Sequence, residues 1–132
     1  MFFNSHVPAV LRRLHEQGYT LAIFSNQGGF SKHNPFAGRG KAVMTKIDTF
    51  THQLALPITA FLATARDGNR KPQAGMLRMF KASCGVQSLH ADSFFCGDAA
   101  GRPHDHSADD KAFAEAAGLK FMLPEEVFVK EC

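Results

Sequence analysis

The stretch "FCGDAAGRPHDHSADD" (residues 95–110) places four aspartates in a Gly/Ala/His-rich loop after an apolar run: Asp98, Asp105, Asp109 and Asp110. The run "DSFFCGD" (92–98) predicts a buried strand. Ser107 and Asp110 resemble a capping box and predict the start of a helix over "DDKAFAEAAG", which Gly118 ends. The stretch is therefore a strand, a loop and a helix, with carboxylates where the strand ends.

The same alternation of helix and strand extends in both directions. A first apolar stripe at helical spacing precedes the strand "TLAIFS" (20–25), and a second precedes the strand "ITAFLAT" (58–64). The stripes consist of Val7, Val10, Leu11 and Leu14, and of Val43, Ile47, Phe50 and Leu54. A third helix is expected in "KPQAGMLRMFKASCG" (71–85), with Met76, Met79 and Phe80 in the core, and a last strand in "KFML" (120–123).

Apolar strands that alternate with amphipathic helices predict a mostly parallel sheet covered on both faces, which is a three-layer α/β domain. A chain of 132 residues fits a single domain, residues 1–132. Ligands of such sheets bind beyond the carboxyl ends of the strands, where the strand-to-helix loops meet. These loops are therefore the candidate walls of a site.

Composition excludes several classes of protein. A hydrophobic content of 45% and a net charge of +3 describe a globular chain that tolerates a polyanionic partner without requiring one. The three cysteines have no Cys-x-x-Cys spacing, so we expect reduced thiols in an intracellular protein. The longest apolar stretch, residues 58–65, is too short to cross a bilayer, and no membrane partner is expected.

The three loops supply the chemistry of a phosphate site. They offer the donors Ser25, Asn26 and Gln27, the cations Arg66, Arg70, Lys71 and Arg102, and the strand-end carboxylate Asp98. Donors and cations suit phosphate oxygens, and a carboxylate beside them suits Mg²⁺. The loops together predict a magnesium-dependent phosphate site.

Several motifs resemble those of the haloacid dehalogenase superfamily. Their residues are similar to those of the phosphatase domain of polynucleotide kinase 3′-phosphatases. They are "IFSNQ", "RKPQAGM", "GDAAGR", "DHSADDKAFA" and "PEEVF", in family order between Val7 and Phe128. The resemblance implies a Rossmann-like fold and removal of phosphate from DNA 3′ ends, in DNA repair, while DNA versus RNA preference stays open. It also implies Mg²⁺, a phosphoaspartate intermediate and a nuclear location, with mitochondria as an alternative.

Residue roles follow from the same resemblance. Ser25, with Asn26 beside it, is expected to hydrogen-bond a phosphoryl oxygen, Lys71 to stabilise the transferring phosphoryl group, and Asp98 to bind magnesium. Substrate phosphates are expected to contact four further residues: Gln27, Arg66, Arg70 and Arg102.

One family motif has no counterpart in the chain. The nucleophile and general acid are two aspartates spaced Asp-x-Asp at the end of the first, central strand, but residues 1–47 contain no Asp. Asp48 falls in a predicted helix, and Ala65 stands two residues before Asp67. The chain is either a piece of a longer protein that starts downstream of that strand, which we favour, or a degenerate member.

Loss of the central strand has structural consequences. It is expected to leave a gap, or to make the flanking strands pair directly or borrow a neighbour. Because unpaired sheet edges attract partners, poor stability or self-association is expected.

Other interpretations of the same residues stay open. Asp109 fits a helix-entry charge, and Asp105 either shares that role or reaches the metal through water. The histidines of "HDH" (104–106) are expected to be solvated, not zinc ligands. Two further functions compete with the 3′-phosphatase: a non-catalytic module that binds phosphorylated DNA ends, and a small-molecule phosphatase of the same superfamily. A kinase site is not expected in this chain, because no phosphate-binding glycine loop is present.

Overall fold

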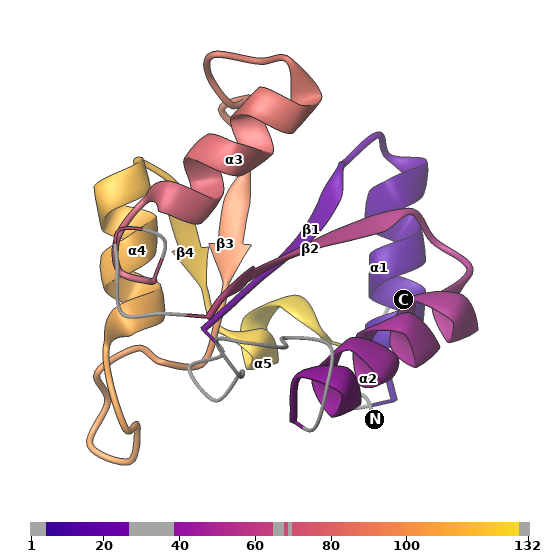
Figure 1. The fold of residues 1–132 in the computed structure, drawn as a ribbon, viewed down its shortest axis with the longest axis horizontal. Helices are drawn as coiled ribbons and strands as arrows, with labels where there is room; N and C mark the ends of the chain where they lie inside the picture. Colours follow the sequence, from indigo (N-terminus) through magenta and orange to yellow (C-terminus); the bar gives the residue numbers. More distant parts are fainter. Residues whose placement is uncertain (1–4, 27–38, 65–67, 69, 130–132) are drawn as a thin grey trace.

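The computed structural model describes residues 5–26, 39–64, 68 and 70–129, and these form an α/β structure (Figure 1). The elements alternate along the chain as predicted. In chain order they are α1 (Val7–Glu16), β1 (Leu21–Asn26), α2 (Arg39–Leu54), β2 (Ile58–Ala63), α3 (Gly75–Cys84), β3 (Phe94–Cys96), α4 (Asp109–Ala117), β4 (Lys120–Met122) and α5 (Pro124–Val127).

The helices form where apolar spacing predicts them. In α1 the buried residues are Val7, Val10 and Leu14, which share one face at helical spacing. Gly18, just past the helix, adopts a positive φ of 95°, a conformation that favours glycine. The core predicted for α3 is correct for Met76, which is buried, and wrong for Met79, which is 53% exposed. Leu77 is buried in its place, because the inward face of this helix runs through Met76, Leu77 and Phe80.

The strands pair in parallel, but the four described strands form two separate sheets. β1 pairs with β2 over six residues, from Leu21 opposite Ile58 to Asn26 opposite Ala63. β3 pairs with β4 over three, and the described strands include no pairing between β1 and β3. The expected α/β class and parallel pairing are confirmed, and the described strands form two pairs instead of one continuous sheet. Of the three expected consequences of a missing strand, the described residues show the gap.

Two clusters of side chains join the half-sheets. On one face the ring of Phe24 in β1 packs against Phe61, Phe80, Phe95 and Phe113, with centroids 5.4–6.3 Å away. These rings come from β1, β2, α3, β3 and α4, so a single aromatic layer connects both sheets. The other face is closed by buried residues of α1 and α5 and by the side chains packed on them, which are Val10, Leu14, Val127, Tyr19, Leu21, Phe94, Cys96, Met122 and Phe128.

The carboxyl ends of the four strands converge near the middle of the molecule (Figure 1). The strands point the same way in each pair, and the two pairs approach each other at this end. Within the described part of the chain, no helix is both long and apolar enough to cross a membrane.

Phe113 provides a test of the aromatic layer. Its side chain is fully buried and contacts Phe24 and Phe95, one from each sheet. We expect Phe113→Ala to lower the free energy of unfolding by about 3–5 kcal/mol, because it opens a cavity where the sheets meet. Chemical denaturation measures this, with the exposed Met79→Ala as the control, expected within about 0.5 kcal/mol of wild type. Equal effects of the two substitutions would contradict the role of the layer.

Candidate active site

Asn26, the last residue of β1, holds the loop that follows β2. Its Oδ1 accepts a hydrogen bond from the backbone N–H of Lys71 at 2.9 Å, and its Nδ2 donates to the Lys71 carbonyl at 3.2 Å. The oxygen and the nitrogen of the Asn26 amide therefore both bond the Lys71 backbone. These two bonds hold the Lys71 backbone at the end of β1. Ser25 precedes Asn26 on the same strand and is half-buried.

The side chain of Lys71 reaches the third loop. Its Nζ lies 2.6 Å from Oδ1 of Asp110, and the two side chains are only 10% and 9% exposed. The other oxygen of Asp110 accepts the backbone N–H of Ala99 at 3.1 Å, next to Asp98. The Ala99 carbonyl in turn accepts the N–H of Asp110. The ends of β1, β2 and β3 are thus linked by one continuous set of contacts.

Asp110 does not have the role predicted from the sequence. The N-cap of α4 is Ala108, which makes no side-chain capping bond, so the predicted capping box of Ser107 and Asp110 is wrong. The Asp110 carboxylate instead binds Lys71 and packs against Gly97, where any Cβ would overlap it. Local sequence patterns do not indicate an ion pair between residues separated by 39 positions. The only indication of this pair is chemical, because a lysine that is buried needs an acidic side chain as its partner.

The Lys71 ammonium keeps donors for a further ligand. An ammonium has three N–H groups, and one is directed at Asp110. Nζ also lies 5.3 Å from the centroid of the Phe95 ring, a cation–π distance. The remaining donors have no protein partner among the described residues, and they can serve an anion. Arg70 is next to Lys71 in the chain and is half-buried.

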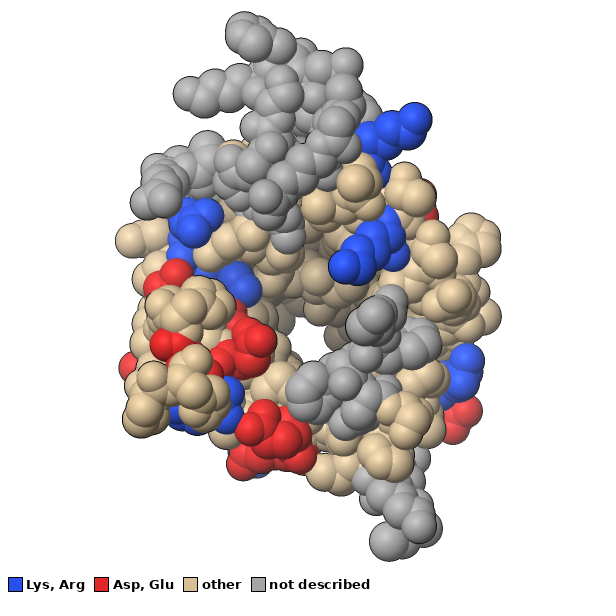
Figure 2. Space-filling view, turned by 90° about the horizontal axis from the view of Figure 1, so that it is seen from below, with Lys and Arg blue, Asp and Glu red and all other residues tan. Residues whose placement is uncertain are grey.

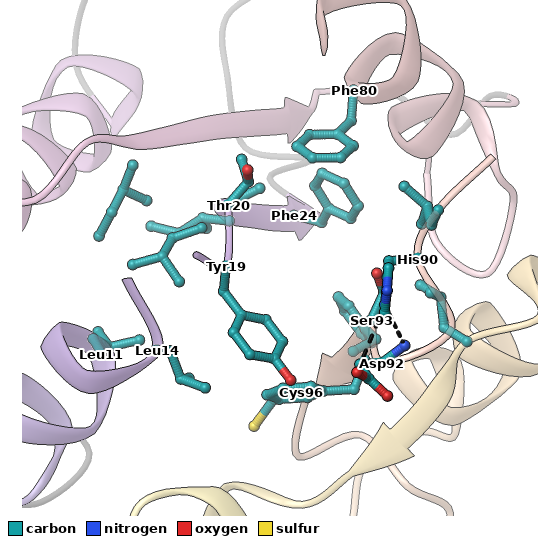
Figure 3. Close-up of a pocket in the computed structure, with 18 of the residues that line it drawn as sticks. Leu11, Leu14, Tyr19, Thr20, Phe24, Phe80, His90, Asp92, Ser93 and Cys96 are labelled. Carbon is teal, nitrogen blue, oxygen red and sulfur yellow. Dashed lines mark hydrogen bonds and ion pairs between the residues drawn. The ribbon is translucent and has the colours of Figure 1, made fainter. Parts of the chain in front are cut away.

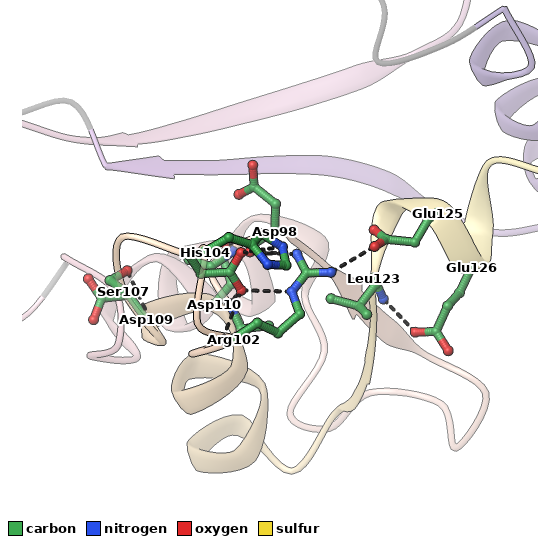
Figure 4. Close-up of polar contacts among 12 residues, drawn as sticks. Asp98, Arg102, His104, Ser107, Asp109, Asp110, Leu123, Glu125 and Glu126 are labelled. Carbon is green, nitrogen blue, oxygen red and sulfur yellow. Dashed lines mark hydrogen bonds and ion pairs between the residues drawn. The ribbon is translucent and has the colours of Figure 1, made fainter.

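Asp98 stands two residues beyond β3 and is exposed. In Figure 4 its carboxylate points away from the ion-paired groups around Arg102, and among the described residues it makes no hydrogen bond or ion pair. Mg²⁺ commonly binds one or two protein carboxylates together with water and phosphate oxygens. Asp98 fits one such ligand. No group of three or more His, Cys, Asp or Glu side chains suited to a metal occurs in the described residues.

Arg102 lies in a network of ion pairs (Figure 4). Its guanidinium binds both oxygens of Asp105, Nε at 2.8 Å and Nη2 at 3.2 Å, and it binds Glu125 through Nη1 at 2.7 Å. The Asp105 carboxylate also accepts the backbone N–H groups of Ala100 and Arg102. These contacts, which we call the Arg102 bracket, connect the loop after β3 to α5.

The bracket explains three pKa shifts. Hydrogen bonds from Arg102 and from backbone N–H groups lower the pKa of Asp105 to about 2. The pKa of Glu125 is lowered by a backbone hydrogen bond and by Arg102, and the pKa of Arg102 is raised by both carboxylates. Asp105 thus organises the loop, a role that the sequence did not indicate. Asp109 begins α4 and its N–H donates to Ser107, as a residue at a helix entry does.

Cys96 is the one cysteine of the described chain near the strand ends, and it is a poor nucleophile. Burial, together with nearby carboxylates led by Asp110, raises its pKa to about 11. It therefore stays a neutral thiol at physiological pH. Cys84 and Cys96 are both free, as expected from their spacing, and Cys84 is exposed.

Several residues that the sequence analysis considered for the site take no part in the contacts described above. Gln27, Arg66, Asp67 and Cys132 lie outside the described residues. Asp48 is exposed on α2, far from any strand end in sequence, as expected. His104 lies 3.4 Å from Asp105 and has a 71% exposed side chain.

Comparison with known proteins places the chain in a family. The family profile described as polynucleotide kinase 3 phosphatase matches residues 1–128. The chain belongs to this family.

Curated relatives carry matching names. The chain is 35% identical over 136 residues to polynucleotide 3′-phosphatase ZDP of Arabidopsis thaliana, covering 93% of this chain and 20% of the relative. It is 39% identical over 128 residues to the bifunctional polynucleotide phosphatase/kinase of Schizosaccharomyces pombe, covering 97% and 31%. A polynucleotide 3′-phosphatase of Saccharomyces cerevisiae is 39% identical over 70 residues, covering 45% and 29%. The chain thus spans a fifth to a third of the length of these relatives.

The buried ion pair of Lys71 and Asp110 can be tested by measuring the free energy of unfolding of variants. We expect Lys71→Met to lower the free energy of unfolding by about 3–5 kcal/mol, because it leaves the Asp110 charge buried without a partner. Adding Asp110→Asn, which keeps an acceptor for the Ala99 N–H, should restore much of the loss. Urea unfolding of the single and double variants measures both effects. A double variant no more stable than Lys71→Met would argue against the ion pair.

The Arg102 bracket predicts a pH dependence. Because the pKa of Asp105 falls from 3.8 to about 2 in the folded protein, its stabilising contribution is complete above about pH 4 and is lost as the pH falls toward 2. We expect Asp105→Asn to lower Tm at pH 5 and to reduce the drop in Tm between pH 5 and pH 2. Thermal melts across this range give the comparison. Asp92→Asn is the control, since Asp92 is 77% exposed, and it should leave the drop unchanged.

Proposed function

We propose that this chain forms the phosphate-binding part of a magnesium-dependent polynucleotide 3′-phosphatase that processes DNA 3′ ends. The observation that carries the proposal is the set of contacts from Asn26 through Lys71 and Asp110 to Ala99, which gathers three strand ends around a lysine with spare donors. Membership of the family supports the reaction class. The names of the relatives support a polynucleotide substrate.

In this proposal, the domain has the three-layer, Rossmann-like arrangement of haloacid dehalogenases. The parallel strands and the helices packed on β2, β3 and β4 support this arrangement. The protein acts on DNA inside the cell, in the nucleus or alternatively in mitochondria.

Each side chain has a role in this proposal. Lys71 donates to the phosphoryl oxygens and offsets their charge in a nearly buried position, where such interactions are strong. Ser25 donates to the same group, and Asn26 is a positioning residue that holds the Lys71 backbone. Arg70 binds a neighbouring phosphate. Asp98 holds Mg²⁺, which supplies charge neutralisation to the phosphate oxygens.

None of the described residues given a role above is assigned as the acceptor of the phosphoryl group. A phosphoaspartate requires a carboxylate at a strand end, and residues 1–47 contain no Asp. The carboxylate of Asp110 is held in its ion pair with Lys71, so it is not free to accept the phosphoryl group. The raised pKa of Cys96 keeps its side chain a neutral thiol. We therefore assign the nucleophile to none of the described residues.

The experiment is phosphate release from a 3′-phosphorylated oligonucleotide in the presence of Mg²⁺. The protein is extended at its N-terminus by a strand that ends in Asp-x-Asp. We expect activity in this protein and none in the 132-residue chain. Asp98→Ala and Lys71→Met should each lower kcat by about 10²–10³, because each removes charge stabilisation of the transition state.

The matched control is Asp109→Ala, which removes an aspartate of the same loop that contacts neither Lys71 nor Arg102. It should retain near-wild-type kcat. Activity unaffected by Asp98→Ala would refute the metal role. Faster hydrolysis of sugar phosphates than of the oligonucleotide would refute the substrate class.

A second candidate function is a non-catalytic module that binds phosphorylated DNA ends. The missing Asp-x-Asp favours it, since phosphate recognition by Lys71 and Arg70 does not need a nucleophile. Binding of a 3′-phosphorylated oligonucleotide that weakens steeply with salt, without turnover in the extended protein, would support this function over the first.

A further inference from the structure

Positive and negative charges are separated in the part of the chain that follows β2. Residues 68–91 contain no Asp or Glu, and their cations are Arg70, Lys71, Arg78 and Lys81. Residues 92–126, which run from just before β3 into α5, contain eight acidic residues and three Lys or Arg. In Figure 2 the acidic side chains near the central hollow gather along its lower left rim, and the basic ones lie mostly above them. A polyanion bound at Lys71 is therefore repelled on the side of α5 and attracted toward α3.

The loop that carries Lys71 is closed at its base by the start of α3. The N–H of Gly75 donates to the Gly68 carbonyl at 2.9 Å. Arg78, in the first turn of α3, reaches back over this closure, and its Nη2 lies 4.0 Å from the position that a Cβ of Gly68 would take. The positive charge of Arg78 is therefore beside the same loop that presents Lys71.

The packing of α3 turns Arg78 to the outside. Phe80 lines the cavity between the two half-sheets, and Figure 3 shows its ring beside that of Phe24, with the centroids 6.0 Å apart. Residues two positions apart on a helix are separated by about 200°, so Arg78 lies opposite Phe80. Arg78 is exposed, and among the described residues it makes no ion pair or side-chain hydrogen bond. Its guanidinium is therefore available to an anionic ligand.

We propose that Arg78 binds an internal phosphodiester of the polynucleotide whose 3′-terminal phosphate lies at Lys71, so that the bound strand leaves the site along the first turn of α3. This inference, which we call the DNA path, rests on the proposed function. α3 begins near the carboxyl ends of the strands and runs away from them, so its first turn is the part closest to the site (Figure 1). A guanidinium suits a phosphodiester because its N–H groups match two phosphate oxygens at once.

This contact makes Arg78 a specificity-determining residue. A terminal phosphate occurs in sugar phosphates, nucleotides and polynucleotides alike, so Lys71 alone does not distinguish these substrates. A phosphodiester next to the terminal phosphate occurs only in the polynucleotide. Because the Arg78 contact is the same in the ground state and in the transition state, it lowers KM for polynucleotides and leaves kcat unchanged.

Binding to the 132-residue chain tests the contact directly. The probe is a short single-stranded DNA with a 5′ fluorophore and either a phosphate or a hydroxyl at its 3′ end, and fluorescence anisotropy gives Kd. Arg78→Gln should weaken the binding of both probes by the same factor, about three- to tenfold at low salt. The slope of log K against log salt concentration should become shallower by about 0.7. Arg78→Lys keeps the charge and should retain most of the affinity.

The matched control is Arg12→Gln, which removes an exposed arginine of α1, across the molecule from α3 (Figure 1). It should leave Kd and the salt slope close to wild type, and both Gln variants should keep the wild-type Tm because both arginines are exposed. Equal weakening by the two variants would overturn the DNA path, because it would reflect net charge alone. No binding, no effect of Arg78→Gln, or an effect on the 3′-phosphorylated probe only would overturn it as well.

Kinetics of the extended protein separate the DNA path from the proposed function. Arg78→Gln should raise KM for the 3′-phosphorylated oligonucleotide at unchanged kcat. Both constants should stay unchanged for a nucleoside 3′-monophosphate, which has no phosphodiester. Phosphate release with an unchanged KM for the oligonucleotide would refute the DNA path and leave the phosphatase function standing. Weaker binding of both DNA probes by Arg78→Gln, without phosphate release from either substrate, would leave the DNA path standing and refute the phosphatase function.

Discussion

The buried pair of Lys71 and Asp110 is the interaction on which the site depends. Moving two charges out of water costs free energy that their attraction offsets only when the geometry is good and the remaining hydrogen-bonding groups are satisfied. Here the distance is 2.6 Å, and the second carboxylate oxygen of Asp110 accepts the N–H of Ala99. The pair adds little net stability but strongly penalises other arrangements. It therefore acts as a positional constraint on the loop after β2, the turn after β3 and the start of α4.

Much of the fold could be predicted because helices and strands leave periodic patterns in the sequence. The helix α1 and the strands β1 and β2 match their apolar runs within a residue or two. β3 is shorter than predicted, with three residues, because its described ladder partner β4 is itself three residues long. Strand length depends on the partner as well as on the strand's own residues. The division into two sheets depends on which strands pair across the fold, and apolar patterns along the chain do not reveal that.

The site was predictable in its location but not in its pairings. The rule that loops meet at the carboxyl ends of parallel strands correctly brought Asn26, Lys71 and the Asp98 turn together. The sequence could not indicate which of four neighbouring aspartates is buried. Asp98, Asp105, Asp109 and Asp110 share one loop, yet they are respectively exposed, bound to Arg102, at a helix entry and bound to Lys71. These differences arise from backbone direction and distant partners, not from residue type.

The same reasoning separates two of the predicted phosphate-binding cations, Arg102 and Lys71. Arg102 donates to Asp105, to Glu125 and to the Asp98 carbonyl, so a substrate phosphate would have to replace at least one of these acceptors. Lys71 has one carboxylate partner and two further donors, so it can bind a phosphate without losing Asp110. Hydrogen bonds from the guanidinium also lower the pKa of Asp105, which keeps that carboxylate charged and the bracket closed at neutral pH. Arg102 thus holds the backbone of the Asp98 turn against α5, whereas Lys71 keeps donors that can serve an anion.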